Sequence, residues 1–402
     1  MPDLITSPKV QEMGGLSLTA RASRESTRRT LADWELTGSF PSLSVIVLNY
    51  RSEDVTVLCL QSVSASNYEG SIDIVLVDNG STPQSLAKFK GLAASLACNV
   101  KLIASEENLG FAGGVLAAWP HANGDLVCLL NNDALVHPEC FRNLVEGFRG
   151  RNQVGAVWPY DAPPAWHENL KTPCDSELAV LRNGTHSIIG SNIWLPLLKD
   201  YRQCFTGSGV CMLFSKQDVD FPFPGEYFAY FEDVFLGWRL QLKGLRIERE
   251  TSAVIYHIGS ATATKHPMLR PVLAFHAEKN RLANLLLFYS STTLILILPL
   301  LILAELSSLA ASIWSLLRAE QRMARLRIHL SSRMWLLRHA RWLWRMRSQL
   351  QMEREVPDRH ILLLLSGQMT MRNSRVGKLL NTFSLAYCRL VRIRTVEFES
   401  QR

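Results

Sequence analysis

The sequence predicts an α/β fold built on a mostly parallel, Rossmann-like sheet. Two observations carry this prediction. Short apolar segments rich in β-branched residues alternate with helix-like segments four times between residues 43 and 131, and most of these apolar segments end in polar residues. The alternation indicates βαβ units and a parallel sheet. Polar residues directly after buried strands are typical of a ligand site at the carboxyl edge of such a sheet.

The expected elements follow the apolar pattern in chain order. Four strands are predicted at residues 44–48, 72–77, 100–103 and 126–130. Helices are predicted around residues 58–63, up to residue 98, from the glycine-rich turn at 107–114 to about 119, and from about 138. Farther along, a small-residue turn enters a strand at 206–214, and two short strands are predicted at 244–247 and 252–257.

Polar residues follow three of the predicted strands: Asn49-Tyr50, Asp78-Asn79 and Asn131-Asn132-Asp133. An Asp after the second strand can accept hydrogen bonds from a base or ribose. Asp133 offers a carboxylate to Mg²⁺ or Mn²⁺, ions that complete their shells with substrate phosphates. Structural alternatives exist for both acids. Residues 78–81 can form an ordinary turn, and Asp133 can cap the helix expected near residue 138.

A glycine-rich turn at residues 107–114 opens the third predicted helix. Glycine lets the backbone approach a ligand closely. The spacing of these glycines is not G-x-G-x-x-G, and the chain has no G-x-x-x-x-G-K-[ST] loop. The sequence therefore supports neither a dinucleotide-binding fingerprint nor a P-loop.

Two adjacent acids, Glu232 and Asp233, open a predicted helix behind the aromatic residues 227–231. A carboxylate at a helix N-terminus can act as a cap. An acid beside aromatic rings can also have its pKa moved toward the range of a general base. His257 ends a predicted strand, where it is either a structural histidine or a third member of a metal site with Asp133.

As an ordered set, these residues resemble the inverting nucleotide-sugar glycosyltransferases of family two, which have the GT-A fold, and among them the bacterial rhamnosyltransferase-like branch. The resemblance covers about residues 43–320. It rests on residues 45–50, 77–81, 107–114, 129–133 and 231–233, and on His257.

The resemblance implies a donor site and a metal site. The residues implied to contact the nucleotide-sugar donor are Asn49, Tyr50, Asp78, Asn108, Gly110, Phe111, Asn131 and Asn132. Asp133 matches the last acid of the family's D-x-D motif, in which Asn131 replaces the first acid. Asp133 and His257 would then hold Mg²⁺ or Mn²⁺ together with the donor diphosphate.

The acceptor side follows from the acid pair. Asp233 matches the general base that takes a proton from the acceptor hydroxyl, and Glu232 would position the acceptor. Phe235 stands where members commonly have a further Asp, which bears on acceptor recognition. The implied donors are dTDP-rhamnose or a UDP- or GDP-sugar. The implied acceptor is a cell-surface polysaccharide or a lipid-linked molecule.

Composition points to a membrane rather than to nucleic acid. The net charge is +7, and nine arginines but one acid lie between residues 318 and 347. No charge falls between Arg281 and Glu305, so this stretch has the length of about 20 residues that a spanning helix needs. A hairpin or interfacial insertion broken near Pro299 keeps the arginines on the cytoplasmic face of the membrane. A buried core helix is the alternative.

These patterns predict four regions: an N-terminal arm at 1–40, a catalytic domain at 41–270, an apolar membrane-inserting segment at 271–317 and a basic amphipathic tail at 318–402. The eight cysteines show no C-x-x-C spacing and are predicted to be reduced core thiols.

The sequence also bears on three other functions. A sugar-phosphate nucleotidylyltransferase would be expected to have a Gly-rich loop after the first strand, and a processive synthase a Q-x-x-R-W element; the sequence has neither. A non-catalytic membrane-associated scaffold that retains the fold remains open.

Overall fold

The computed structural model describes residues 38–149, 151, 153–162, 182–196, 202–258, 267–315 and 322–399. Residues 1–37 of the predicted N-terminal arm lie outside this range. The chain divides into two compact units. Unit 1 comprises Met1–Cys174, Gly207–Asp233 and Leu245–Pro267, and unit 2 comprises Asp175–Thr206, Val234–Gly244 and Met268–Arg402.

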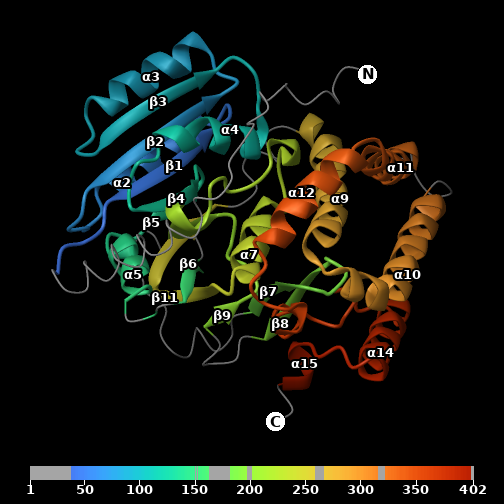
Figure 1. The fold of residues 1–402 in the computed structure, drawn as a ribbon. Helices are drawn as coiled ribbons and strands as arrows, with labels where there is room; N and C mark the ends of the chain where they lie inside the picture. Colours follow the sequence, from blue (N-terminus) through green and yellow to red (C-terminus); the bar gives the residue numbers. More distant parts are fainter. Residues whose placement is uncertain are drawn as a thin grey trace. The chain divides into compact units, whose positions relative to one another are not determined.

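Unit 1 is built on a mixed sheet (Figure 1). Its strands are β1 (Leu43–Asn49), β2 (Ile72–Asn79), β3 (Asn99–Ser105), β4 (Leu126–Asn131), β5 (Ala134–Val136), β6 (Val154–Ala162), β10 (Cys211–Ser215) and β11 (Arg246–His257). They lie in the order β3-β2-β1-β4-β10-β6-β11-β5. The first four pair in parallel, and β10 runs antiparallel to both of its neighbours. This arrangement confirms the predicted α/β class, with the four sequence-predicted strands side by side.

Helices cover both faces of this sheet. Three helices, α2 (Glu53–Ser64), α3 (Pro83–Ala93) and α5 (Cys140–Glu146), share a core with alternate residues of the central strands, such as Val45, Leu76 and Cys128. Helix α4 (Gly110–Ala118) lies against the intervening residues. A Cβ on Gly114 would be 2.3 Å from Leu48 Cδ2, so a side chain here would require Leu48 to move.

The structure corrects two expectations about unit 1. Residues 246–257 form one strand rather than two, with irregular registers against β6 between Glu250 and Val254. The polar residues 248–252 interrupt the apolar pattern without ending the strand. Asp133 does not cap a helix, because β5 follows it and α5 begins only at Cys140, behind Glu139.

The predicted state of the cysteines is confirmed for the residues described. Seven are free thiols, and all but the half-buried Cys98 are buried. Cys174 lies outside the described residues.

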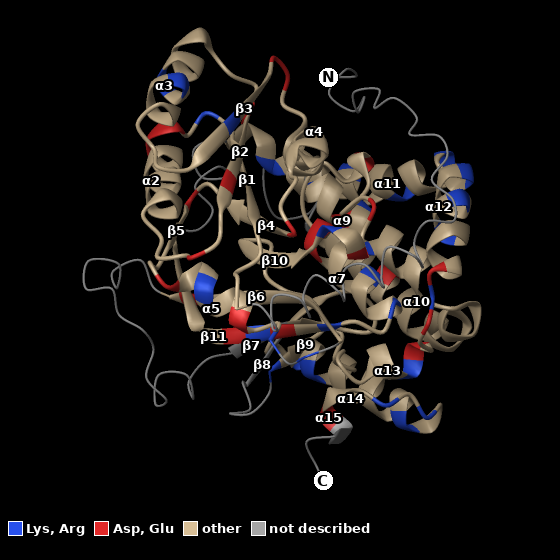
Figure 2. Cartoon of the chain, turned by 60° about the vertical axis from the view of Figure 1, so that its left-hand side comes forward, with Lys and Arg blue, Asp and Glu red and all other residues tan. Residues whose placement is uncertain are grey.

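Unit 2 is mainly helical. Its hairpin consists of β7 (Arg182–His186) and β8 (Asn192–Pro196). Its helices are most of α7 (Glu232–Leu242), then α9 (Arg270–Phe288), α10 (Ser291–Ser315), α11 (Arg322–Arg338), α12 (Ala340–Met352), α13 (Asp358–Leu362), α14 (Arg375–Leu390) and α15 (Val396–Glu399). Lys and Arg recur along α12 and α14 (Figure 2).

The aromatic residues of α7 fill the core of unit 2. Phe235 packs edge-on against Phe288, with ring centroids 5.0 Å apart, and Trp238 stacks on the same ring. Phe235 is fully buried. An Asp at this position would be buried without water, so this site favours an apolar side chain.

A buried ion pair joins α7 to the C-terminal part of unit 2. Arg239 is 1% exposed, and its Nε donates to Glu353 Oε2 at 2.7 Å. Lys243 Nζ lies 3.4 Å from the same carboxylate oxygen. A buried guanidinium is tolerated where such a partner neutralises it.

Helix α10 is, among the described residues, the one helix long and apolar enough to cross a membrane, and 11% of its most apolar window is buried. The predicted break near Pro299 is wrong, because Pro299 lies inside α10. The chain turns instead between α9 and α10. There the backbone N–H of Ser290 donates to Asp358 Oδ2 at 2.8 Å.

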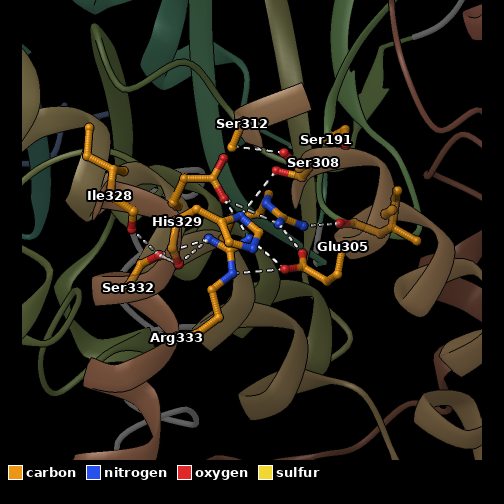
Figure 3. Close-up of polar contacts among 12 residues, drawn as sticks. Ser191, Glu305, Ser308, Ser312, Ile328, His329, Ser332 and Arg333 are labelled. Atoms are coloured by element: carbon orange, nitrogen blue, oxygen red, sulfur yellow. Dashed lines mark hydrogen bonds and ion pairs between the residues drawn. The ribbon is translucent and has the colours of Figure 1, made fainter. Parts of the chain in front are cut away.

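A charge cluster fixes α10 to its neighbours (Figure 3). Glu305 of α10 lies 2.8 Å from Arg281 of α9 and 2.6 Å from Arg333 of α11. Glu278 pairs with the same two arginines, at 3.5 and 3.1 Å. Burial would raise the pKa of Glu305, but the charges and hydrogen bonds of Arg281 and Arg333 outweigh it and lower that pKa. Glu305 therefore attaches one side of the apolar helix α10 to α9 and α11 through ion pairs.

Candidate active site

A hydrogen-bond network joins the carboxyl ends of β1, β2 and β4. Asn49 Nδ2 donates to Asp78 Oδ1 at 2.8 Å, and the two residues are register partners. Ser85 of α3 donates to the other carboxylate oxygen of Asp78 at 2.8 Å. Thr56 of α2 donates to Asn49 Oδ1, and Asn132 Nδ2 donates to Thr56, each at 2.8 Å. These bonds hold three strand ends and two helices in one arrangement.

Asn49 and Asp78 have no exposed surface, since both are 0% accessible. Both oxygens of Asp78 already accept hydrogen bonds from the protein. The structure gives these two residues a positioning role beneath the strand ends. Their predicted contact with a nucleoside stays a prediction.

The glycine-rich turn is held by a residue that the sequence patterns did not single out for this role. Asn79 Oδ1 accepts from the N–H of Leu109 at 2.7 Å, and its Nδ2 donates to the carbonyl of Gly110 at 3.0 Å. Asn108 Oδ1 accepts from the N–H of Gly110 at 2.9 Å. The turn is therefore fixed at both ends before α4 begins.

Gly110 is required by the backbone and by its neighbour. Its φ is +70°, which side-chain-bearing residues rarely adopt, and a Cβ there would be 2.5 Å from the carbonyl oxygen of Phe228. That carbonyl accepts from the N–H of Ala112 at 2.9 Å. The start of α4 thus holds the aromatic segment that precedes Glu232.

Two predicted donor-site aromatics remain partly accessible. Tyr50 is half-buried, and its ring lies beside Gly80, where a Cβ would be 3.2 Å from Tyr50 Cε2. Phe111 is also half-buried, with its ring centroid 6.0 Å from that of Phe223. Unlike Asn49 and Asp78, these rings have surface with which to contact a ligand.

Asp133 and His257 are brought together, as predicted from the sequence. His257 Nε2 lies 3.2 Å from Asp133 Oδ1, and His257 Nδ1 lies 3.5 Å from Asp161 Oδ2. Backbone pairing fixes the approach, because the N–H of Ile258 donates to the Asp133 carbonyl at 3.0 Å. Burial would lower the pKa of His257, but hydrogen bonds and charges of the two acids raise it to about 9.

This pair fits a divalent cation of the Mg²⁺ or Mn²⁺ type. A carboxylate oxygen and an imidazole nitrogen are ligand atoms that such a cation accepts. In the chain without a metal these atoms lie 3.2 Å apart as an ion pair, and His257 would have to release a proton before it could bind a cation. Within the described ranges, no group of three or more His, Cys, Asp or Glu could hold an ion alone. A cation here would need further ligands, such as phosphate oxygens.

Glu232 and Asp233 open α7, as predicted. Burial, and secondly the charge of Asp233, raise the pKa of Glu232 to about 8. Glu232 Oε2 is buried and has no hydrogen-bond partner among the described residues. A Cβ on Gly209 would be 3.3 Å from Asp233 Oδ2, so the small-residue turn at 206–209 lies directly against the acid.

The segment before this acid pair is conformationally strained. Phe228, Tyr230 and Phe231 all have positive φ, between 59° and 67°. Such values cost energy in bulky residues and cluster at functional sites. Tyr230 is 48% exposed, so this segment presents an aromatic surface next to the two acids.

The two halves of the site connect through the backbone of β4. The N–H of Asn131 donates to the carbonyl of Val210 at 2.8 Å, and Gly209 beside it contacts Asp233. The sequence patterns singled out Asn131 to Asp133, Glu232, Asp233 and His257. They gave no role to Thr56 or Asp161, because a lone Thr or Asp has no spacing signal and becomes recognisable only through its contacts.

Residues 44–215 match the model of the family described as Glycosyl transferase family 2. This segment is a glycosyltransferase family 2 domain. Together with the sheet order, the match confirms the predicted GT-A fold class.

Curated relatives match the same part of the chain. An N-acetylglucosaminyltransferase of Azorhizobium caulinodans is 30% identical over 120 residues, which are 29% of this chain and 30% of that protein. An undecaprenyl-phosphate 4-deoxy-4-formamido-L-arabinose transferase of Edwardsiella ictaluri is 30% identical over 118 residues, 29% of this chain and 36% of that protein. The matches therefore span about a third of the length of these relatives.

A solved structure is similar over a longer range. The mannosyltransferase PcManGT from Pyrobaculum calidifontis, in complex with GDP-Man and Mn²⁺, aligns with a TM-score of 0.45 at 15% identity. The alignment covers 83% of this chain and 95% of that one.

Proposed function

We propose that the protein is a membrane-associated, inverting glycosyltransferase that moves a sugar from a nucleoside diphosphate to a glycan or lipid-linked acceptor. One observation carries the proposal: at the carboxyl end of β4, inside the segment that matches the family 2 model, Asp133 lies 3.2 Å from His257 of β11. This is the edge of an α/β sheet at which ligands bind.

Asp233 is the proposed general base. It takes the proton of the acceptor hydroxyl while the acceptor oxygen forms a bond to the anomeric carbon of the donor sugar. The bond between that carbon and the diphosphate breaks, and the nucleoside diphosphate leaves with the electron pair. A single attack of this kind inverts the anomeric centre.

Glu232 is the proposed acceptor-positioning residue. Burial raises its pKa to about 8, so it keeps its proton near neutral pH. A protonated Glu232 can donate a hydrogen bond to an acceptor oxygen. In this proposal the start of α7 carries one general base, Asp233, and one hydrogen-bond donor, Glu232.

Asp133 and His257 are the proposed ligands of Mg²⁺ or Mn²⁺. When bound, such an ion supplies charge compensation for the departing diphosphate. Asp161 faces the other nitrogen of His257 and holds the imidazole in orientation. The other proposed donor-site residues are Asn49, Tyr50, Asp78, Asn108, Gly110, Phe111, Asn131 and Asn132.

The finer specificity is part of the same proposal. The resemblance favours dTDP-rhamnose over a UDP- or GDP-sugar. The name of the Edwardsiella relative, a transferase acting on undecaprenyl-phosphate, supports a lipid-linked acceptor in cell-wall or polysaccharide synthesis. The apolar α10 supports membrane attachment, which we place at the cytoplasmic face. The predicted division at residues 41–270, 271–317 and 318–402 is retained as a proposal.

Calorimetric titration with a panel of nucleoside diphosphates, with and without Mn²⁺, tests the donor site. We expect one base to bind only with Mn²⁺, and Asp133→Ala to abolish that binding. Asp233→Asn is the matched variant, which should bind the same nucleotide normally but lose transfer to acceptor. An Asp233→Asn protein with normal turnover would refute the base assignment. Failure of every nucleotide to bind would favour the scaffold function.

A further inference from the structure

Helix α14 carries an apolar surface that the rest of the described chain does not cover. Val376 is 67% exposed, Leu379 70%, Phe383 50% and Leu390 80%. At 3.6 residues per turn these four side chains fall within an arc of about 60°. We call them the α14 stripe.

A row of basic residues lies next to the α14 stripe. Arg375, Lys378 and Arg389 are all exposed, and the helix geometry places them within a second arc of about 60° beside the first. No acidic residue occurs between Asp358 and Glu397. The outer surface of α14 is therefore divided into an apolar part and a purely cationic part.

Hydrogen bonds on the inner side fix the rotation of α14 about its axis. Asn381 Oδ1 accepts from the N–H groups of Met369 and Thr370, at 2.9 and 3.1 Å. Ser384 Oγ donates to the carbonyl of Gly367 at 2.6 Å. With these residues turned inward, the α14 stripe can only face outward.

Helix α14 also meets the apolar helix α10 of the same unit at one hydrogen bond. Tyr387 Oη donates to the carbonyl of Leu296 at 2.8 Å. Ile295, the residue before it, is 70% exposed, and Leu298 is 49% exposed. The two helices that meet at this hydrogen bond thus both present apolar side chains to the outside.

We propose that α14 is an interfacial helix that lies in the plane of an anionic lipid bilayer, with the α14 stripe among the acyl chains and the basic row among the headgroups. An exposed apolar stripe flanked by Lys and Arg, without acids, is the pattern that such surfaces bind. A second copy of the chain would bring another row of the same charge, which opposes that pairing. The inference deepens the membrane association proposed above and does not depend on sugar transfer.

Flotation of the full chain with vesicles tests this proposal. We expect the protein to float with vesicles of phosphatidylcholine and phosphatidylglycerol, weakly with phosphatidylcholine alone, and less as salt is raised. Leu379→Glu with Phe383→Glu should lower the partition coefficient at least tenfold, because two apolar groups leave the bilayer. Leu379→Gln with Phe383→Gln should act in the same direction without a change of charge.

The matched control is Gln84→Glu with Ala87→Glu, which adds the same charge at exposed positions of α3, away from α14 in the sequence. We expect a loss of no more than about threefold. Equal losses in the control and the stripe variants would overturn the proposal. So would equal binding to both kinds of vesicle. A dimer in sedimentation that Leu379→Gln with Phe383→Gln dissociates would assign the stripe to a contact between copies instead.

Discussion

Glu232→Gln should change how the stability of the protein depends on pH. In the folded chain, burial and the charge of Asp233 raise the pKa of Glu232 from 4.5 to about 8. The folded state therefore holds a proton that the unfolded chain has released between these two values. The free energy of unfolding falls as pH rises through this window, and the penalty is complete above pH 8.

The shift of about 3.5 units corresponds to a ceiling of about 5 kcal/mol at 1.36 kcal/mol per unit. Because water still reaches part of the side chain, we expect about 1–3 kcal/mol. Glutamine carries no charge at any pH, so Glu232→Gln should be more stable than the wild type at pH 9 by this amount. At pH 5 the two proteins should be nearly equal.

Urea unfolding followed by tryptophan fluorescence at pH 5, 7 and 9 measures this difference. Glu106→Gln, at an exposed position, is the control and should follow the wild type at every pH. Parallel pH profiles for Glu232→Gln and the wild type would refute the reasoning, because they would mean that Glu232 ionises normally in the folded chain.

Three further perturbations follow from single contacts. Gly110→Ala places a Cβ 2.5 Å from the Phe228 carbonyl oxygen, so the segment before Glu232 and Asp233 must move. We expect a lower kcat, measured by product formation, and an unchanged nucleotide affinity, measured by calorimetry. Glu353→Gln leaves the buried Arg239 without its charged partner and should cost about 3–5 kcal/mol in urea unfolding. Asp161→Asn should weaken Mn²⁺ binding about tenfold, measured by calorimetry of the protein without donor sugar.

The fold of unit 1 was predictable because its strands are short, apolar and bounded by polar residues. β1, β2 and β4 deviate from their predicted limits by two residues or fewer. The expectation of two strands at 244–257 was wrong. The polar residues 248–252 interrupt the apolar pattern and so predict the end of a strand, but the backbone pairs with β6 on both sides of this stretch. The expected break at Pro299 was also wrong, because here too a local sequence signal did not end the element. Proline lacks a donor, but the single lost hydrogen bond does not stop a long helix held by its neighbours.

The candidate site could be predicted where its polar residues follow predicted strands or stand next to one another in the sequence. Asp133 and His257 are 124 positions apart, yet they were expected together and lie 3.2 Å apart. Thr56 and Asp161 were missed because neither belongs to a motif, and their roles become visible only through their contacts with Asn49, Asn132 and His257. The α14 stripe was missed because its apolar residues are spaced for a helix face, and spacing alone does not say whether that face is buried or exposed.

Unit 2 is assembled from three separate segments of the chain, and this affects the order in which the two units can fold during translation. Unit 2 draws on residues 175–206, 234–244 and 268–402, whereas the last segment of unit 1 ends at residue 267. Arg239 leaves the ribosome 114 residues before Glu353. At about 5–20 residues per second, that ion pair cannot form for roughly 6–23 s of translation. Nascent chains should therefore complete unit 1 first and expose the segment around Arg239 until Glu353 has been synthesised. A premature stop before codon 353 should yield a product with one finished unit and one that chaperones or proteases recognise.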